Sequence, residues 1–406
     1  MSSIKMHASR RKIVTAAVNA VGLSAVVMPL ALVRAQTPAP KGASIKSPEP
    51  LGPALGDTIV IGQTAALTGG LSFFNLAHNA GATAAFSEVN AKGGIHGRKL
   101  KFVSLDDAYD PQRAVVNFDR LIGEEKAFAL FSIGGLPANQ ALTPLILKGR
   151  IPHIAPATGA DYMRVPLNPV IFHVRASYGN EINKLVEHVK TVGIKRIACV
   201  YSSNPFGLTL LSALDAACKV HGATLVTEVA LEDKAGADDE ALIKLFAKPF
   251  DALFLIAATA GPVGIALVKK INAKHKGTQL FTLSLLASPL ALKALGPDAV
   301  GLSVSQVMPS PTSATSPLVR EYQAAMKAAG VAELTYPSIE GFVNARILIT
   351  GLQAAGKDLT REKLVAAMDK LQFDLGGLPI SFTPENHIGS RYVELTLVGA
   401  GGRFIK

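Results

Sequence analysis

Two loops carry the residues best suited to hold a small ligand. The first, 132–137, contains Gly134 and Gly135 and joins a strand-like run to a helix-like run. Its glycines let backbone N–H groups approach a ligand, and a helix start adds unpaired donors and a positive dipole end, which favours a carboxylate. The second loop, 156–159, adds the hydroxyl of Thr158. Glycine-rich turns are also routine in α/β proteins, so a ligand site and an ordinary turn both stay open.

Sequence patterns of the common enzyme classes are missing. There is no Gly-x-Ser-x-Gly, no His-Glu-x-x-His and no Cys-x-x-Cys, and no Gly-x-Gly-x-x-Gly follows a strand. The nine histidines lack the spacing of zinc ligands, and isolated ones such as His173 and His188 are expected on the surface or in the core. We therefore expect no enzyme, no cofactor and no metal site.

The segment 351–358 fits most of a phosphate-binding loop. It runs from Gly351 to Gly356-Lys357, but Asp358 stands where a Ser or Thr would hold magnesium. The segment also ends a helix, and the C-terminus of a helix repels phosphate. We interpret Gly356 as a helix stop.

The N-terminus has the pattern of an export signal. Residues 1–35 carry five Lys or Arg and no acid, followed by the apolar stretch Ile13–Val33 and the small-residue pattern Val33-Arg34-Ala35. This predicts a signal peptide cleaved before Gln36, with a membrane anchor as the alternative, and Arg10-Arg11 resembles a twin-arginine signal. The Pro-rich stretch 36–56 is expected to be a linker.

The net charge of +11 is misleading, because the first 35 residues account for five of these charges. The other charges are interspersed, without a cluster of Lys and Arg among aromatic residues. This excludes a typical nucleic-acid-binding surface. Cys199 and Cys218 could form a disulfide in an oxidising compartment, but two small buried side chains are favoured.

Strand-like and helix-like segments alternate after residue 57, which predicts parallel sheets covered by helices on both faces. Strands are predicted at 58–63, 100–105, 128–132, 151–155, 170–174, 196–202, 224–231, 252–256 and 279–284. Helices are predicted at 79–91, 111–123, 138–148, 181–192, 208–220, 238–247 and 262–274.

The last part of the chain breaks this alternation. Helices are predicted at 317–329, 338–355 and 360–370, and closing strands at 378–383 and 392–397. Because one core rarely serves more than about 250–300 residues, two lobes are expected. A chain that crosses between them more than once makes a hinge, which suits closure on a ligand.

One run of residues resembles a known family. Asn90-Ala-Lys-Gly-Gly-Ile-His-Gly-Arg-Lys-Leu100, followed by Asp106-Asp107 and Asp110-Pro111, is similar to the type I periplasmic binding proteins of the leucine/isoleucine/valine-binding class. Ile154-Ala-Pro-Ala-Thr158 also matches the family's ligand loop. The likeness extends from residue 57 to residue 406.

The resemblance implies an α/β fold of two Rossmann-like lobes joined by three crossover strands. Lobe 1 would comprise 57–175 plus 308–376, and lobe 2 would comprise 176–307 plus 377–406. The crossings would fall near Arg175–Tyr178, Gln306–Pro309 and Gly376–Pro379.

The resemblance also implies a function. The protein would capture a small amino acid or related carboxylate in the periplasm for an ABC importer, whose permease and ATPase are separate chains. The alternative is a ligand-sensing receptor that acts through a signalling partner, because fold does not fix function.

The family's ligand contacts carry over position by position. Gly135 stands where a serine helps to hold an amino acid's carboxylate, and Ser284 stands where an acid holds its ammonium. Aromatic residues that cover the ligand match Phe74 and Phe206. The expected ligand-binding set is Phe74, Gly134, Gly135, Leu136, Ala157, Thr158, Tyr178, Phe206 and Ser284.

Ser284 departs from the family pattern in a way that concerns the ligand. A buried ammonium without a carboxylate partner costs several kcal/mol. Glu181 would replace the missing acid if it faces the cleft, although an acid at a helix start also simply suits the helix dipole. Two ligand types therefore stay open: an amino acid held differently, and a carboxylate or amide without an ammonium, such as an aromatic or keto acid.

Overall fold

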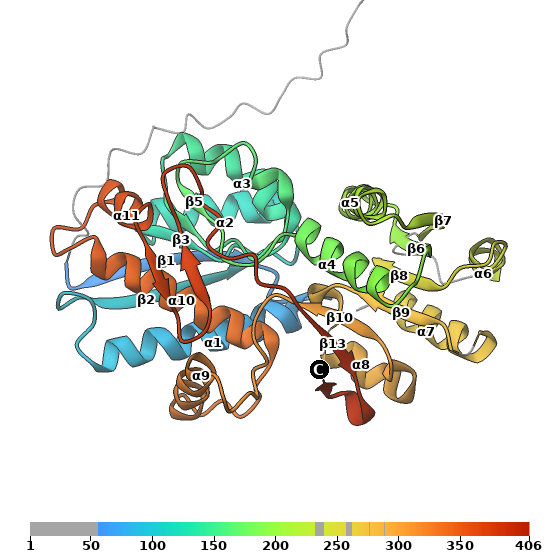
Figure 1. Ribbon diagram of the computed structural model, residues 1–406. Coiled ribbons are helices and arrows are strands. Elements are labelled where there is room, and N and C mark those ends of the chain that lie inside the picture. The colour runs from blue at the N-terminus through green and yellow to red at the C-terminus, as the bar shows by residue number, and fades with distance from the viewer. Residues whose placement is uncertain (1–55, 232–238, 257–261, 276, 288, 406) are drawn as a thin grey trace, which may run out of the picture. The chain divides into compact units, whose positions relative to one another are not determined.

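The computed structural model describes residues 56–231, 239–256, 262–275, 277–287 and 289–405 (Figure 1). The predicted signal peptide, 1–35, and nearly all of the predicted linker, 36–56, lie outside the described residues. Within the described part of the chain, no helix is both long and apolar enough to cross a membrane.

The first third of the described chain supplies a parallel sheet of five strands in the order β2-β1-β3-β4-β5. Both faces of this sheet are buried. Ile59 and Ile61 belong to one core cluster, whereas Leu130 belongs to another on the opposite face. The strands are β1 (Thr58–Ala65), β2 (Lys99–Asp106), β3 (Ala129–Phe131), β4 (His153–Ile154) and β5 (Ile171–Phe172).

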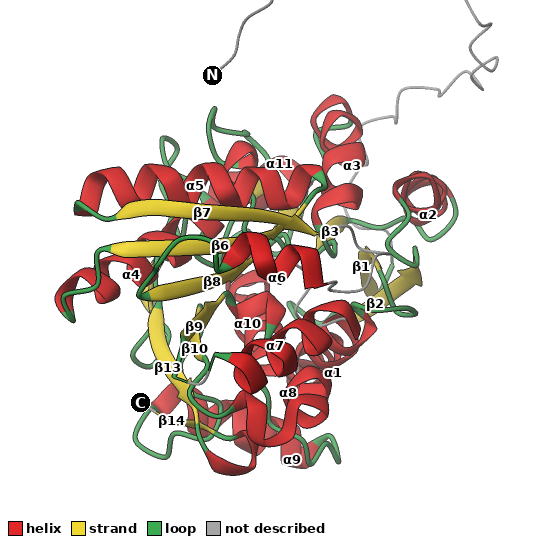
Figure 2. Cartoon of the chain, turned by 90° about the vertical axis from the view of Figure 1, so that its right-hand side faces the viewer, coloured by secondary structure: helices red, strands yellow, loops and turns green. Residues whose placement is uncertain are grey.

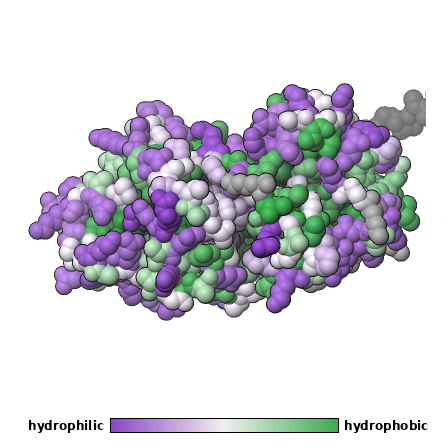
Figure 3. All heavy atoms as spheres, turned by 60° about the horizontal axis from the view of Figure 1, so that its bottom comes forward, coloured by the Kyte–Doolittle hydropathy of each residue, from purple (hydrophilic) through white to green (hydrophobic). Residues whose placement is uncertain are grey.

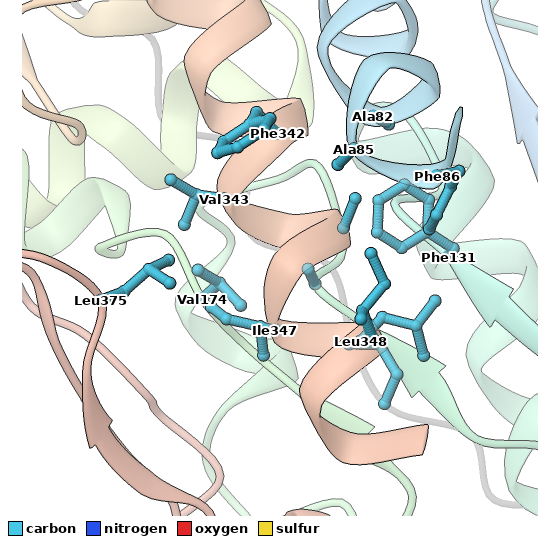
Figure 4. Packing of buried hydrophobic residues seen from close by; sticks show 14 of the residues in the cluster. Ala82, Ala85, Phe86, Phe131, Val174, Phe342, Val343, Ile347, Leu348 and Leu375 are labelled. Carbon is cyan, nitrogen blue, oxygen red and sulfur yellow. The ribbon is translucent and has the colours of Figure 1, made fainter. Parts of the chain in front are cut away.

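Helices cover both faces of the five-stranded sheet. One face carries α1 (Ser72–Ala91), α9 (Pro317–Ala328), α10 (Tyr336–Ala354) and α11 (Arg361–Met368), and the other carries α2 (Pro111–Gly123) and α3 (Leu136–Lys148). Figure 4 shows Ala82, Ala85 and Phe86 of α1 close to Phe342 and Leu348 of α10.

α1 and α10 approach so closely that two glycines are required at their contact. A Cβ on Gly81 would overlap the Ser338 carbonyl oxygen, and a Cβ on Gly341 would overlap the His78 carbonyl oxygen. The late helices therefore complete a core that begins about 250 residues earlier in the chain.

The second sheet has seven strands in the order β14-β13-β10-β9-β8-β6-β7. The strands from β7 to β10 are parallel, and β13 and β14 add antiparallel edge strands. They are β6 (Arg196–Ser202), β7 (Thr224–Leu231), β8 (Ala252–Ile256), β9 (Gln279–Thr282), β10 (Ser303–Gln306), β13 (Glu394–Val398) and β14 (Phe404–Ile405). In their parallel part both sheets repeat one order, with the second strand at the edge next to the first.

Helices also cover both faces of the seven-stranded sheet (Figure 2). Alternate residues of β6 face opposite ways, with Ile197 and Cys199 in one core and Ala198 and Val200 in the other. One face carries α4 (Tyr178–Thr191) and α5 (Pro205–His221), and the other carries α6 (Asp239–Leu245), α7 (Pro262–Lys274) and α8 (Pro289–Leu295). Cys199 and Cys218 are buried on the α5 side as free thiols.

Short elements complete the fold. They are the hairpin β11 (Gln372–Asp374) and β12 (Pro379–Ser381), and the 3-10 helices η1 (Asp161–Met163), η2 (Ser284–Leu286), η3 (Gly296–Ala299) and η4 (Ala400–Gly402). Leu378, Ile380 and Phe382 of the hairpin region lie in the same core cluster as Ile59. The chain therefore returns to the seven-stranded sheet at β13, later than the expected boundary at residue 377.

The residues that carry the family resemblance hold loops in place. Asn90 bonds the backbone of Leu100 through both its Oδ1 and its Nδ2. Asp110 accepts hydrogen bonds from two backbone N–H groups at the start of α2, which begins at Pro111 as predicted. α10 ends at Ala354 and Gly356 adopts a positive φ, which confirms a helix stop in the segment that resembles a phosphate-binding loop.

Candidate ligand-binding site

A cavity of about 1130 Å³ lies between segments from the two halves of the fold. Phe73, Phe74 and the loops 310–312 and 333–337 line one side, and residues between Ser284 and Val300 line the other together with 400–405. On the face that Figure 3 shows, weakly polar and apolar residues gather in the middle. The cavity has the size and mixed lining of a site for a small organic molecule.

The predicted site residues divide into two groups around this cavity. Phe74 and Ser284 lie on its wall. Ala157 and Tyr178 instead belong to a buried cluster that also includes Phe74, and Phe206 packs against that cluster. In this structure the expected aromatic cover therefore packs mainly against protein atoms.

Thr158 contacts Tyr178 of this cluster. Thr158 is fully buried, and its Oγ1 lies 3.4 Å from the hydroxyl oxygen of Tyr178. The Tyr178 ring lies so close to Gly159 that a Cβ there would be 2.6 Å from it, and it stacks edge-on against Phe206 at 5.4 Å. The loop that carries Thr158 is thus held by an aromatic residue at the start of α4.

The loop 134–136 does not offer the free donors that we predicted. The N–H of Gly134 donates to the Thr64 carbonyl at 3.0 Å, and the N–H of Gly135 donates to the Ala157 carbonyl at 3.2 Å. Both acceptor residues are distant in sequence from this loop. The two hydrogen bonds continue the strand pairing of the five-stranded sheet past the end of β3. Both N–H groups are therefore occupied within the protein in this structure, and carboxylate binding by this loop stays a prediction, while Leu136 begins α3.

A buried charge cluster lies behind Ser284. Arg175 is 1% exposed, and its Nη2 donates to Glu181 Oε1 at 3.2 Å and to Ser284 Oγ at 2.9 Å. Glu181 Oε2 accepts from the N–H of Ser284 at 3.0 Å and from Ser305 Oγ at 2.7 Å. Both carboxylate oxygens of Glu181 are thus occupied within the protein, so Glu181 does not replace the missing ammonium partner in this structure.

The other side of Arg175 faces α10. Its Nη1 lies 3.5 Å from Glu340 Oε1, and the Arg175 Cζ lies 5.8 Å from the centre of the Tyr178 ring. Burial raises the pKa of Glu340, because desolvation outweighs the attraction of Arg175. Burial, with Arg175 as the second cause, lowers the pKa of His78 to about 3, so this neighbour is neutral.

Sequence reasoning did not reveal that Arg175 and Glu340 form a charge cluster in contact with Ser284. Arg175 was expected at a chain crossing, and it lies between β5 and α4, but no ligand role was given to it. A single arginine in the apolar run 170–176 was the available signal, because a buried arginine needs partners. Nothing in the sequence pointed to the cavity walls at 333–337 and 400–405.

No group of three or more His, Cys, Asp or Glu side chains in the described part of the chain could hold a metal ion. The charged residues on the cavity wall are Lys293, Glu333 and Arg403. With its apolar and hydroxyl-bearing residues, this lining suits binding of an organic molecule.

The chain matches known proteins over most of its length. The model of a family described as periplasmic binding protein matches residues 58–403. Leu/Ile/Val-binding protein homolog 6 of Brucella melitensis is 24% identical over 315 residues, which cover 73% of this chain and 80% of that protein.

Solved structures match the fold. A substrate-binding periplasmic protein from Ralstonia solanacearum is 29% identical, with a TM-score of 0.76 over 86% of this chain and 99% of that one. A possible leucine/isoleucine/valine-binding protein from Rhodopirellula baltica is 26% identical, with a TM-score of 0.79 over 87% of this chain and 98% of that one.

Proposed function

This chain belongs to the periplasmic binding protein family, as a type I member of the branched-chain amino acid class, and we propose that it is the solute-binding component of an ABC importer. It would capture a small amino acid or related carboxylate outside the cytoplasm and deliver it to a separate permease driven by an ATPase. The family is one of solute-binding proteins, which supports a role in capture rather than catalysis.

The cavity between the two halves of the fold supports this proposal most directly. Its walls come from segments near residues 73, 311 and 335 on one side and near 284 and 400 on the other. A ligand bound there touches both halves, so its binding energy favours the arrangement in which they lie together.

The proposed ligand contacts begin with Phe74 and Ser284, the two predicted site residues on the cavity wall. When the two lobes move apart, four further predicted residues would become accessible to the ligand: Ala157, Thr158, Tyr178 and Phe206. The lobes would hinge near Arg175–Tyr178 and Gln306–Pro309, with a third crossing at 383–393, where β12 leads to β13.

A thermal-shift screen of amino acids and of aromatic and aliphatic carboxylates, followed by small-angle scattering, tests the proposal. A ligand at 100 times its Kd adds about 2.7 kcal/mol to the unfolding free energy. The radius of gyration should fall when such a ligand saturates the protein. Strong binding without any change in this radius would contradict closure.

Export is a separate part of the proposal. Cleavage after Ala35 would release a protein that begins at Gln36. N-terminal sequencing of the protein recovered from the periplasm should find that residue. Recovery of the uncleaved chain in the membrane fraction would contradict it.

A further inference from the structure

The hydroxyl of Ser284 has a fixed direction of hydrogen bonding. Arginine only donates, so Ser284 Oγ must accept from Arg175 Nη2, 2.9 Å away. Among the described residues, this is the hydroxyl's only hydrogen bond. Its own hydrogen is therefore left to donate, and Ser284 lies on the cavity wall.

We infer that Ser284, positioned by Arg175, donates a hydrogen bond to an anionic group of the ligand, and that this ligand is a carboxylate without an ammonium group. The inference rests on the proposed function and gives its site a ligand class. In the family pattern described above, an acid at this position accepts a hydrogen bond from an ammonium. Ser284 would instead donate one, so the direction of the hydrogen bond is reversed.

The hydrogen bonds around Ser284 favour an anion. Arg175 is buried between Glu181 and Glu340, with its Nη1 3.5 Å from Glu340 Oε1, and its Nε has no hydrogen-bond partner among the described residues. Glu181 has both oxygens occupied by Arg175, Ser284 and Ser305. An ammonium at Ser284 would meet a hydroxyl that already accepts from Arg175 and a Glu181 carboxylate that is already occupied, whereas a carboxylate there would meet the remaining O–H donor of Ser284.

The rest of the cavity wall indicates what kind of molecule carries the carboxylate. Phe73, Phe74, Leu292, Tyr336 and Phe404 give the cavity a largely apolar lining. Glu333 is the one acidic residue on the described wall. It is solvent-exposed and shares the lining with the cationic Lys293 and Arg403. These residues suit a branched or aromatic body attached to the carboxylate.

Matched ligand pairs test the class. 4-Methylpentanoate and L-leucine share a carbon skeleton and differ by the ammonium, as do 3-phenylpropionate and L-phenylalanine. Calorimetry should show at least tenfold tighter binding of one acid than of its amino acid. Equal or tighter binding of both amino acids would overturn the inference and leave the proposed function intact, and loss of that binding in Glu333→Gln would place the ammonium at Glu333.

Variants test the residue. Ser284→Ala should weaken binding of the preferred acid roughly ten- to a hundredfold, as expected for a hydrogen bond to a charged group. Ser305→Ala removes a neighbouring hydroxyl of the same charge cluster that also bonds Glu181, and it should keep the preference for the acid. Unchanged binding in Ser284→Ala, or an equal loss in Ser305→Ala, would overturn the role of Ser284. Failure of all four compounds to bind would overturn the ligand class, and only a wider screen without any ligand would count against the proposed function.

Discussion

Arg175 Nη2 lies 2.9 Å from Ser284 Oγ, although 109 positions separate the two residues. Arg175 follows β5 of the five-stranded sheet, and Ser284 follows β9 of the seven-stranded sheet. The same guanidinium also lies 3.5 Å from Glu340 on α10. One buried cation therefore joins the crossing of the chain, both halves of the fold and the cavity wall.

Removal of the Arg175 charge should destabilise the protein strongly. Arg175→Met leaves Glu181 buried without its cation, and breaking a buried pair in this way costs about 3–5 kcal/mol. Arg196→Met is the control. The ion pair between Arg196 and Asp251 is exposed, so this variant should lose far less unfolding free energy. Urea denaturation measures the unfolding free energy of both variants. Equal losses would show that the buried Arg175 pair stabilises the protein no more than an exposed ion pair.

Phe74 and Phe86 allow ligand binding to be separated from core packing. Both are buried phenylalanines of α1, but only Phe74 lines the cavity. Alanine at either position should cost about 3–5 kcal/mol of stability. Calorimetry on the folded variants should find weaker ligand binding for Phe74→Ala alone. Similar affinities for the two variants would remove Phe74 from the proposed site.

Stability should fall in acid because of buried histidines. Burial lowers the pKa of His78 and of His153 to about 3, and lowers that of His173 well below its usual value. The unfolded chain takes up protons near pH 6.5 and the folded protein does not. The unfolding free energy should therefore decrease as pH falls from about 6.5 toward 3, by up to about 1.4 kcal/mol per pH unit for each histidine.

The slope of unfolding free energy against pH checks this origin. His153→Gln should reduce this slope by the contribution of one histidine. This change in slope is expected whether or not the substitution also alters the unfolding free energy at neutral pH. His188→Gln removes an exposed histidine from α4 and serves as the control. The same slope in wild type and His153→Gln would point to other titrating groups.

The contact between α1 and α10 should not tolerate a methyl group. Gly341→Ala places a Cβ on the His78 carbonyl, and backbone cannot move aside without separating the helices. A loss of about 1–3 kcal/mol or more is expected. Gly351→Ala, on the same helix, meets the flexible Met368 side chain and should cost less. Thermal unfolding compares the two, and the reverse order would contradict this account of the contact.

The fold followed from local patterns where those patterns were strong. The predicted helices 111–123 and 262–274 and the predicted strands 196–202, 224–231 and 252–256 match the structure. Strand β10 was not predicted, because its sequence Ser-Val-Ser-Gln is short and polar at alternate positions. Its place between β9 and β13 depends on tertiary pairing.

The site was less predictable, because its polar groups find partners far away in the sequence. Gly134 and Gly135 looked like free donors until Thr64 and Ala157 supplied acceptors. The sequence shows only that Ser284 is uncharged. Its hydroxyl accepts a hydrogen bond from Arg175 and keeps its own hydrogen to donate, which residue type alone cannot reveal. Phe74 and Ser284, two positions that the family pattern marked, both line the cavity.

The hairpin at β11–β12 has a consequence for the order of events during synthesis. Phe382 fills the first core, and β13 joins the second sheet soon afterwards. A ribosome that has made the chain as far as Ala354 therefore carries two unfinished cores at once. Native packing of both halves can be completed only after β13 has been made, so part of each core stays uncovered until late in synthesis.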